Sequence, residues 1–491
     1  MTTNIAAFLD AAATAEPGRP ALIVDDGTVC GYGDLQGEVG RWASTLAAAG
    51  VAVGDRVALA DWGGVRSTAV TLAAAHLGAA TAQMNPLLTA DELAQLVATA
   101  GCGPVGVADA GAAAALERAT GAPPLAVPAG GDAPPRSPGG EAAALVLFTS
   151  GTTGLPKAVP ISHDAIVGRV SAYRPAYAPD RPPGIGIMCV PSFHVGGMLG
   201  LLLSLYGGDT TVVMPRFDAG RWLELVERHR IASAFLVPTM LARILDHPRA
   251  ATADLSSLRA VAYGAAAAPV ALIRRAMEMW PQVGFANTFG QTETLGGYTS
   301  LTPEDHRDPA RIGSVGRALP GVEVRVVDPA TGADLPDGEV GELWVRSPQN
   351  VVEGWLHTGD LARRDADGYL YPSGRMSDTI NRGGEKFASA EVADVIRSHP
   401  AVADVGVVGV PDEEMGERVG VAVVVRPGSD PPSLQDLREW SRGRVAPFKL
   451  PERLVVVDAL PYNELGKMPR RAVVGLISVS EPGGPAATSR T

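Results

Sequence analysis

The chain has 491 residues, enough for two or more hydrophobic cores, and its 46% hydrophobic content excludes a disordered chain. A formal net charge of −12 argues against nucleic acid as the main partner, because a phosphate backbone attracts a basic face. Cys30, Cys102 and Cys189 are too far apart in sequence for a metal-binding motif, so we expect reduced thiols and a cytoplasmic location. No basic leader precedes the first apolar residues, and the apolar stretch 197–206 is about half a membrane span, so we expect neither a secretory signal nor membrane insertion.

The N-terminal part of the sequence alternates helix-like and strand-like segments. Apolar residues within 5–9 are spaced as on one face of a helix, and residues 88–98 have helical periodicity. Residues 21–24 and 56–60 are short apolar runs typical of buried strands. This alternation predicts an α/β fold, with a large N-terminal domain of β-α-β sheets.

The pattern changes further along the chain. Residues 122–140 are rich in proline and glycine and predict a loop. Short strand-like runs with glycine turns over 322–346 predict a small β-barrel subdomain or sandwich. Toward the C-terminus, a helix over 390–399 and apolar runs at 405–410 and 419–425 predict a compact α+β domain.

The most informative motif is a run of hydroxyl, glycine and lysine residues that follows a short apolar strand at 146–148. Glycines let oxygen atoms approach the main chain, main-chain N–H groups at a strand end bind anions, and lysine adds positive charge. The run lacks the Gly-Lys-Ser/Thr ending of a Walker A loop. We expect it to cradle a polyphosphate through Thr149, Ser150, Gly151, Thr152, Thr153, Gly154 and Lys157.

Four further motifs follow in order. They are Phe289-Gly290-Gln291-Thr292-Glu293, His357-Thr358-Gly359-Asp360-Leu361, Gly374-Arg375-Met376-Ser377-Asp378 and Asn463-Glu464-Leu465-Gly466-Lys467. Together with the phosphate loop they resemble the adenylate-forming superfamily of acyl-CoA synthetases, aryl-CoA ligases, luciferases and peptide synthetase adenylation domains. The resemblance extends from about residue 5 to about residue 475.

The resemblance implies ATP and Mg²⁺ as cofactors, with the phosphate loop holding the leaving pyrophosphate. Glu293, beside the hydroxyl of Thr292, would hold the Mg²⁺, a metal that prefers oxygen ligands and bridges phosphates. Phe289 would lie against the adenine. The other residues implied to contact the nucleotide in this part of the chain are Gly264, Ala265, Ala266, Thr288 and Gly290.

The remaining site residues lie later in the sequence, apart from His194. Asp360, at a predicted turn, would accept hydrogen bonds from the ribose hydroxyls, and Arg375 would reach ribose or phosphate. Lys467 would contact the attacking carboxylate and the α-phosphate during adenylation, and His194 would form the wall beside the carboxylate end of the acid. Gly383 and Gly384 match the loop that lines the thiol tunnel for CoA.

The resemblance also implies a mobile C-terminal domain that rotates about a hinge between two half-reactions. The family generally has Asp or Lys two positions after the arginine that corresponds to Arg375, whereas this chain has Ser377. The expected organisation is an N-terminal adenylating domain (1–374), a hinge (375–378), a mobile C-terminal domain (379–478) and a disordered tail (479–491).

The implied activity is an ATP-dependent acid:CoA ligase that forms an acyl-AMP and then an acyl-CoA thioester. We expect a small aryl or short- to medium-chain carboxylic acid as substrate, and a homodimer is left open. Three alternatives remain. The acceptor could be a carrier-protein thiol or an amine, the activated acid could be a non-carboxylate oxyacid such as nitrite, or the chain could be a nucleotide-binding pseudoenzyme.

Overall fold

A computed structural model describes residues 4–128, 131–150, 156–173, 182–383, 385–463 and 466–479, without the side chains of Ser150, Lys386 and Val479. The chain forms two compact units. The first consists of Met1–Glu323 and Arg346–Leu356, and the second of Val324–Val345 and His357–Thr491. The hinge at 375–378 stays a prediction, because a division into compact units does not show about which residues a domain rotates.

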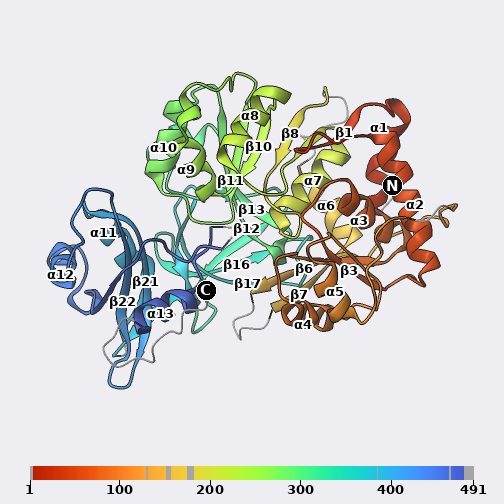
Figure 1. The fold of residues 1–491 in the computed structure, drawn as a ribbon. Coiled ribbons are helices and arrows are strands. Elements are labelled where there is room, and N and C mark those ends of the chain that lie inside the picture. The colour runs from red at the N-terminus through yellow and green to blue at the C-terminus, as the bar shows by residue number, and fades with distance from the viewer. Residues whose placement is uncertain are drawn as a thin grey trace. The chain divides into compact units, whose positions relative to one another are not determined.

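The first unit contains two sheets (Figure 1). In the described residues the larger has nine strands in the order β14-β13-β12-β11-β10-β8-β9-β1-β2, and its central strands are parallel. Its strands are β1 (Pro20–Val24), β2 (Val29–Gly31), β8 (Ile185–Met188), β9 (Thr210–Val213), β10 (Ser233–Leu236), β11 (Ala260–Gly264), β12 (Gly284–Gln291), β13 (Gly296–Leu301) and β14 (Arg317–Ala318).

The smaller sheet of this unit has the order β5-β3-β4-β6-β7. Its strands are β3 (Arg56–Ala60), β4 (Ala80–Met84), β5 (Gly106–Ala108), β6 (Ala143–Ser150) and β7 (Pro156–Ser162). Parallel pairing of β3 with β4 and β5 requires helical crossovers, which α3 and α4 supply. The predicted α/β fold of the N-terminal part is therefore confirmed.

Helices surround both sheets. The α-helices are α1 (Asp10–Ala15), α2 (Tyr32–Ala48), α3 (Val65–Leu77), α4 (Ala90–Ala100), α5 (Ala113–Thr120), α6 (His163–Ala172), α7 (Val195–Gly207), α8 (Ala219–His229), α9 (Pro238–Asp246) and α10 (Val270–Met279). Short 3-10 helices are η1 (Ile5–Leu9), η3 (Pro248–Ala251), η4 (Thr292–Thr294) and η5 (Asp305–Arg307).

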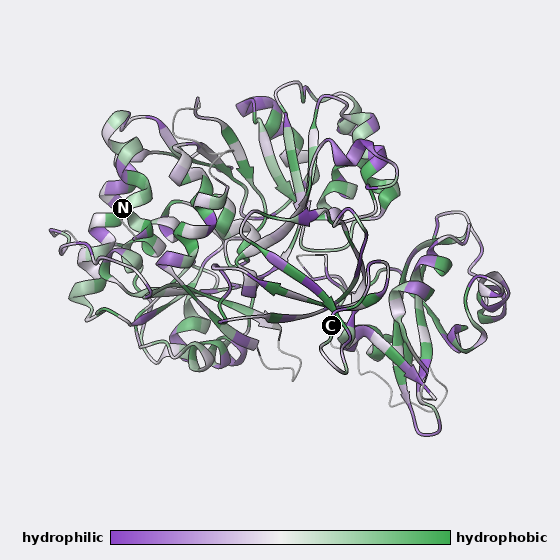
Figure 2. Ribbon diagram, turned by 180° about the vertical axis from the view of Figure 1, so that it is seen from behind, coloured by the Kyte–Doolittle hydropathy of each residue, from purple (hydrophilic) through white to green (hydrophobic). Residues whose placement is uncertain are grey.

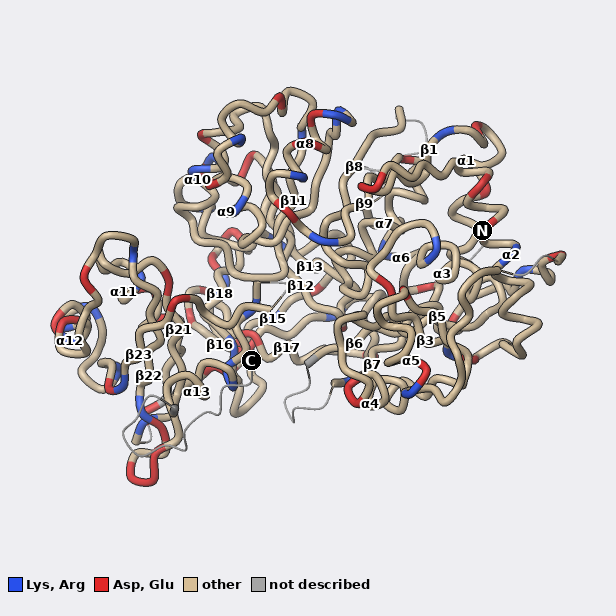
Figure 3. The backbone as a smooth tube through the Cα atoms, in the orientation of Figure 1, with Lys and Arg blue, Asp and Glu red and all other residues tan. Residues whose placement is uncertain are grey.

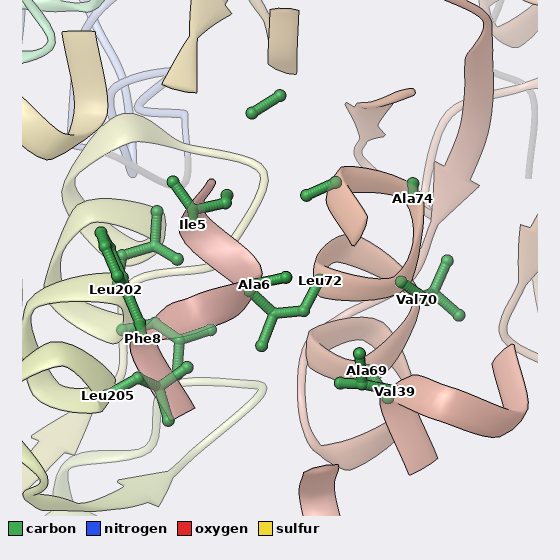
Figure 4. Close-up of a cluster of buried hydrophobic side chains, with 14 of the residues drawn as sticks. Ile5, Ala6, Phe8, Val39, Ala69, Val70, Leu72, Ala74, Leu202 and Leu205 are labelled. Atoms are coloured by element: carbon green, nitrogen blue, oxygen red, sulfur yellow. The ribbon is translucent and has the colours of Figure 1, made fainter. Parts of the chain in front are cut away.

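The predicted N-terminal helix is confirmed and is part of the main core. Ile5 and Phe8 of η1 lie against Leu202 and Leu205 of α7, while Ala6 faces α3 (Figure 4). Hydrophobic residues are concentrated in the strands and in the inward faces of the helices (Figure 2). Burial of this apolar surface is the main free-energy gain that holds the first unit together.

In the second unit, the segment predicted as a small β-barrel is an open sheet in the described residues. Its order is β15-β16-β17-β18, and the edge strands β15 and β18 do not pair. Four strands are too few to close around an interior that side chains can fill, so this detail of the prediction is wrong. The strands are β15 (Glu323–Val327), β16 (Val340–Arg346), β17 (Leu356–Arg364) and β18 (Leu370–Arg375).

The rest of the second unit is the predicted α+β domain. Its sheet has the order β20-β19-β22-β21, with β23 added to β22. Ile380, Val392 and Val421 are in its core. The elements are β19 (Thr379–Arg382), β20 (Glu385–Ala388), β21 (Val402–Asp412), β22 (Gly416–Val425), β23 (Arg453–Val456), α11 (Ser389–Arg397), α12 (Leu434–Ser441), α13 (Arg470–Val479), η6 (Met376–Asp378) and η7 (Pro447–Lys449).

Charged residues of both signs are interspersed along the chain, with acidic residues at the tip of the β21–β22 hairpin (Figure 3). All three cysteines are free thiols, as predicted. Among the helices of the described ranges, none has the length and apolar character needed to cross a bilayer.

Gly290 is a position where the fold requires the absence of a side chain. A Cβ atom there would lie 1.9 Å from the carbonyl oxygen of Gly296, on the antiparallel strand β13. We therefore expect Gly290→Ala to lower the melting temperature, at a cost of about 1–3 kcal/mol. Gly200→Ala is the matched control, because Gly200 is exposed in α7 with no atom within 4 Å of the added Cβ, and alanine there should stabilise the helix. Equal melting temperatures of the two variants in a calorimetric scan would contradict this account.

Candidate functional site

The strands β6 and β7 flank the predicted phosphate loop in the sequence. β6 and β7 pair antiparallel, with Thr149 opposite Lys157 and Ser150 opposite Pro156. The buried strand predicted before the loop is confirmed, since Val146 and Leu147 are buried. Gly151, Thr152, Thr153 and Gly154 lie outside the described residues. Both ends of the predicted loop are therefore strand residues, and pairing fixes Thr149 across from the exposed Lys157.

β11 and β12 are parallel neighbours, and β12 continues to Gln291, beyond the point where β11 ends. Gly264 pairs with Thr288, and a Cβ on Gly264 would lie 2.2 Å from the Thr288 carbonyl oxygen. Ala265 then adopts φ = +67°, a left-handed conformation that is strained for alanine. The predicted segments 264–266 and 288–293 thus begin side by side at the carboxyl end of β11, the edge where open α/β sheets bind ligands.

Glu293 is on a tightly held turn between β12 and β13. The Gln291 N–H donates to the Thr294 hydroxyl over 3.1 Å, and that hydroxyl donates to the Gly296 carbonyl over 2.7 Å. The carbonyl of Glu293 itself accepts from the Val351 N–H at 3.0 Å. The backbone is therefore fixed on both sides of Glu293, and the described residues offer its half-buried carboxylate neither an ion pair nor a hydrogen bond.

The donor set around Glu293 fits a magnesium ion that arrives with a nucleotide. No group of three or more His, Cys, Asp or Glu side chains able to hold a metal is found in the described part of the chain. Mg²⁺ commonly takes one or two protein carboxylates and completes its shell with phosphate oxygens and water. One carboxylate, with the Thr292 hydroxyl beside it, is sufficient for that arrangement.

Asp360 and Arg375 form an ion pair in the second unit. They are directly opposite each other on β17 and β18, and Arg375 Nε lies 2.8 Å from Asp360 Oδ1. Asp360 is only 6% exposed. Burial raises its pKa, while the positive charges of Arg375 and Lys467 act in the opposite direction and Asp378 adds to the rise. The structure thus brings three predicted site residues, Asp360, Arg375 and Lys467, into one electrostatic group.

The predicted turn at Asp360 is wrong in detail, because Thr358, Gly359 and Asp360 lie within the strand β17. Gly359 has φ = +69°, which interrupts the regular strand conformation without ending the strand. The Thr358 hydroxyl donates to the Leu343 carbonyl at 2.6 Å and accepts from the Asp360 N–H at 3.0 Å. These bonds orient the Asp360 backbone.

Lys467 is exposed, and its backbone is held by reciprocal hydrogen bonds with Asn463. The Lys467 N–H donates to Asn463 Oδ1 at 2.9 Å, and the Asn463 N–H donates to the Lys467 carbonyl at 2.8 Å. Glu464 and Leu465 lie outside the described residues. The long side chain therefore projects from a fixed backbone.

The predicted hinge residue Ser377 is exposed in η6, and its hydroxyl donates to Asp378 Oδ1 at 3.1 Å. Arg470, in the first turn of α13, donates from Nη1 to the Ser377 carbonyl at 2.8 Å and forms an ion pair with Glu417. Arg470 was not predicted from the sequence. No local pattern indicates it, because the contact joins residues 93 positions apart.

Two other predicted residues have defined surroundings. His194 precedes α7, and its ring centroid is 4.7 Å from that of Phe193, which in turn lies 6.1 Å from Trp62. His194 thus belongs to an aromatic cluster in the first unit. In the second unit, Gly383 has φ = +59° and its N–H donates to the Met415 carbonyl at 2.8 Å, while Gly384 lies outside the described residues.

Sequence reasoning also missed Arg169, which is fully buried in α6. A signal was present, because Arg169 lies on the same helical face as the buried residues His163, Ile166 and Val170. An arginine within an apolar stripe is unusual and warrants a specific explanation.

The sequence profile of the AMP-binding enzyme family matches residues 9–356, and that of the AMP-binding enzyme C-terminal domain matches residues 391–467. The chain is 32% identical over 500 residues to ScoC, a fatty acid–[acyl-carrier-protein] ligase of Streptomyces coeruleorubidus, with 93% of both chains covered. It is 34% identical over 516 residues to the indoleacetate–CoA ligase of Aromatoleum aromaticum, covering 97% of this chain and 98% of the relative.

Solved structures of similar fold include the amide bond synthetase McbA from Marinactinospora thermotolerans, with a TM-score of 0.83 and 31% identity over 96% of this chain and 99% of McbA. Another is the o-succinylbenzoate coenzyme A synthetase from Bacillus subtilis in complex with ATP and magnesium ion. Its TM-score is 0.79 and its identity 27%, with coverage of 94% of this chain and 98% of the synthetase.

The buried Asp360 carboxylate leads to a prediction about stability. Its pKa is raised in the folded protein, so the stability it contributes is present below its unfolded pKa and is lost as the pH rises through the folded pKa. We therefore expect Asp360→Asn to raise the melting temperature at neutral pH, with a gain that shrinks on acidification. Arg375→Gln should lower it at neutral pH, because a compensating charge is removed. Thermal unfolding of both variants across the acidic range is the measurement, and a less stable Asp360→Asn at neutral pH contradicts the account.

Proposed function

Because the chain belongs to the family of AMP-binding, adenylate-forming enzymes, as its motifs predicted, we propose that this ligase joins a carboxylic acid to CoA through an acyl-AMP. The observation that carries the proposal is the sheet edge where 264–266 and 288–293 begin side by side, with Glu293 on a fixed turn. An adenylating enzyme needs a nucleotide site of this kind, with a carboxylate ready for a phosphate-bound metal.

In the first half-reaction, a carboxylate oxygen of the acid attacks the α-phosphorus of ATP. The bond from that phosphorus to the oxygen bridging to the β-phosphate breaks, and pyrophosphate leaves with the electron pair. The main barrier is the approach of two anions, so donors and cations must neutralise both. We assign the phosphate contacts to Thr149, Lys157 and the loop between them, and the contact to the attacking carboxylate to Lys467.

Magnesium held by Glu293 would neutralise phosphate charge and fix the geometry of the triphosphate. Asp360, when ionised, accepts hydrogen bonds from the ribose hydroxyls, which are worth about 1.5–3 kcal/mol each for a charged acceptor. The positive charges of Arg375 and Lys467 favour the ionised form of Asp360, because they oppose the rise in its pKa that burial causes. Phe289, whose ring centroid is 5.3 Å from that of Tyr298, provides an aromatic face for the adenine.

In the second half-reaction, the thiolate of CoA attacks the acyl carbon, the bond from that carbon to the AMP oxygen breaks, and AMP leaves. We assign the thiol tunnel to the segment around Gly383 and the rotation to 375–378. Serine at 377 lacks the charge usual in the family, but Arg470 binds its carbonyl in the conformation seen here. Breaking that single hydrogen bond and remaking it is compatible with domain rotation.

A second candidate is transfer of the same acyl group to a carrier-protein thiol or an amine. The uncharged Ser377 favours this second candidate, since a hinge adapted to CoA usually has a charged residue. The similarity to a carrier-protein ligase and to an amide bond synthetase points the same way. Activation of an oxyacid such as nitrite differs from both candidates in the acid rather than in the acceptor.

We expect Glu293→Ala to lose about 3 kcal/mol of transition-state stabilisation, a loss on the order of 100-fold in pyrophosphate release. The reason is that phosphate charge is left uncompensated when the metal is misplaced. Glu278→Ala, which removes an exposed acid on α10, should leave the rate unchanged. Near-normal pyrophosphate release by Glu293→Ala would refute the metal assignment.

The acceptor is tested by AMP release from the wild-type enzyme at saturating acid, with CoA as the only variable. If CoA is the acceptor, AMP release accelerates strongly, because the thiol removes the acyl group from a tightly held acyl-AMP. Absence of any CoA effect across a broad panel of acids would refute the CoA-ligase proposal. Acceleration by amines or by a carrier-protein thiol instead would support the second candidate.

A further inference from the structure

Arg169 is an arginine with too few partners. It is 0% exposed, and its Nη2 donates to the Thr294 carbonyl at 2.7 Å. Its Nε and Nη1 are shielded from solvent and have no hydrogen-bond partner. No carboxylate of the described residues forms an ion pair with it, whereas arginines such as Arg66 and Arg382 have one. A cationic group with two unused donor nitrogens therefore lies inside the first unit.

Such an arrangement is costly unless a ligand completes it. The guanidinium group cannot lose its proton in a protein, and burying it unpaired costs several kcal/mol even after relaxation. Native structures seldom leave buried donors unsatisfied without a reason such as a binding role. Burial lowers the pKa of Arg169, and the electrostatic effect of Tyr173 offsets only part of that. A neutral residue in α6 would fill the same face at no such cost.

The surroundings of Arg169 indicate which ligand is missing. The carbonyl it binds belongs to Thr294, the residue next to Glu293. The Tyr173 hydroxyl oxygen lies 3.4 Å from the position of a Cβ built on Gly297. The same Cβ would lie 3.2 Å from the Thr288 Cβ, so Tyr173 approaches the strand pair that carries 288–293. Gln291 Nε2 on this strand pair is also buried without a partner.

The polar groups thus lie beside 288–293, the segment assigned to the nucleotide and the metal. A Cβ at Gly296 would lie 3.0 Å from the Leu199 side chain, so glycine at this position keeps a further side chain out of this region. One carboxylate beside Arg169 would satisfy both of its unused nitrogens, since a carboxylate accepts up to about four hydrogen bonds and pairs with a guanidinium in a bidentate manner.

We propose that Arg169 recognises a second carboxylate on the acid substrate, so that the preferred substrate is a dicarboxylic acid rather than a plain aryl or fatty acid. This inference rests on the proposed adenylation of a carboxylic acid. One carboxylate is adenylated, while the other forms charge-assisted hydrogen bonds with Arg169. Arg169 is therefore a specificity-determining residue, and Tyr173 and Gln291 border the same subsite.

The experiment measures acid-dependent exchange of labelled pyrophosphate into ATP. It compares dicarboxylic acids of increasing length with their mono-methyl esters, which keep the skeleton but remove one charge. For the best diacid we expect wild-type kcat/KM to exceed that for its ester by at least about 100-fold, because the ester leaves the buried cation unpaired. Arg169→Met should remove this preference, mainly by lowering kcat/KM for the diacid. Arg243→Gln, which changes an exposed arginine on α9, is the matched control and should keep the preference.

The thermal stability of Arg169→Met provides a second readout. The variant should melt at a higher temperature than the wild type without substrate, and the diacid should stabilise only the wild type. If Arg169→Met does not fold, the wild-type comparison of diacid with ester decides the question alone. Exchange with plain monoacids and no preference for any diacid would overturn this inference and leave the proposed function intact. No exchange with any acid would overturn both.

Discussion

The part of the site that lies in the first unit depends on one constraint, the close backbone contact between β12 and β13 at Gly290 and Gly296. The two main chains approach so closely that no Cβ fits between them. The turn that joins them must therefore be short, and the Thr294 hydroxyl ties its two ends together. Glu293 lies in this turn, so the backbone is fixed at the residue to which we assign the phosphate-bound metal.

The same turn links the metal site and the acid subsite that we propose. Two of its carbonyls accept hydrogen bonds from different parts of the first unit, that of Glu293 from the Val351 N–H and that of Thr294 from the buried Arg169. A change at Arg169 would thus act on the backbone beside the metal ligand as well as on the acid. Selectivity for the acid and positioning of the metal are therefore expected to be coupled, through contacts that lie within the first unit.

The sequence predicted the elements that are determined by residues close together in the chain. The strand before the phosphate loop and the N-terminal helix could be read from apolar spacing, and the order of five motifs identified the family. Features that depend on distant contacts were missed. Whether four strands close into a barrel depends on pairing between β15 and β18, and the strand conformation of Asp360 depends on Leu343 and Arg375. The Arg470 contact with Ser377 likewise corresponds to no periodic pattern in the sequence.

The exchange of pyrophosphate into ATP tests the central claim most directly, because it reports reversible acyl-AMP formation without any acceptor. The account predicts exchange that requires both an acid and Mg²⁺ and that proceeds in the absence of CoA, carrier protein or amine. Binding of ATP and Mg²⁺ without exchange for any acid in a broad panel would contradict it, since the chain would then bind the nucleotide without activating a carboxylate.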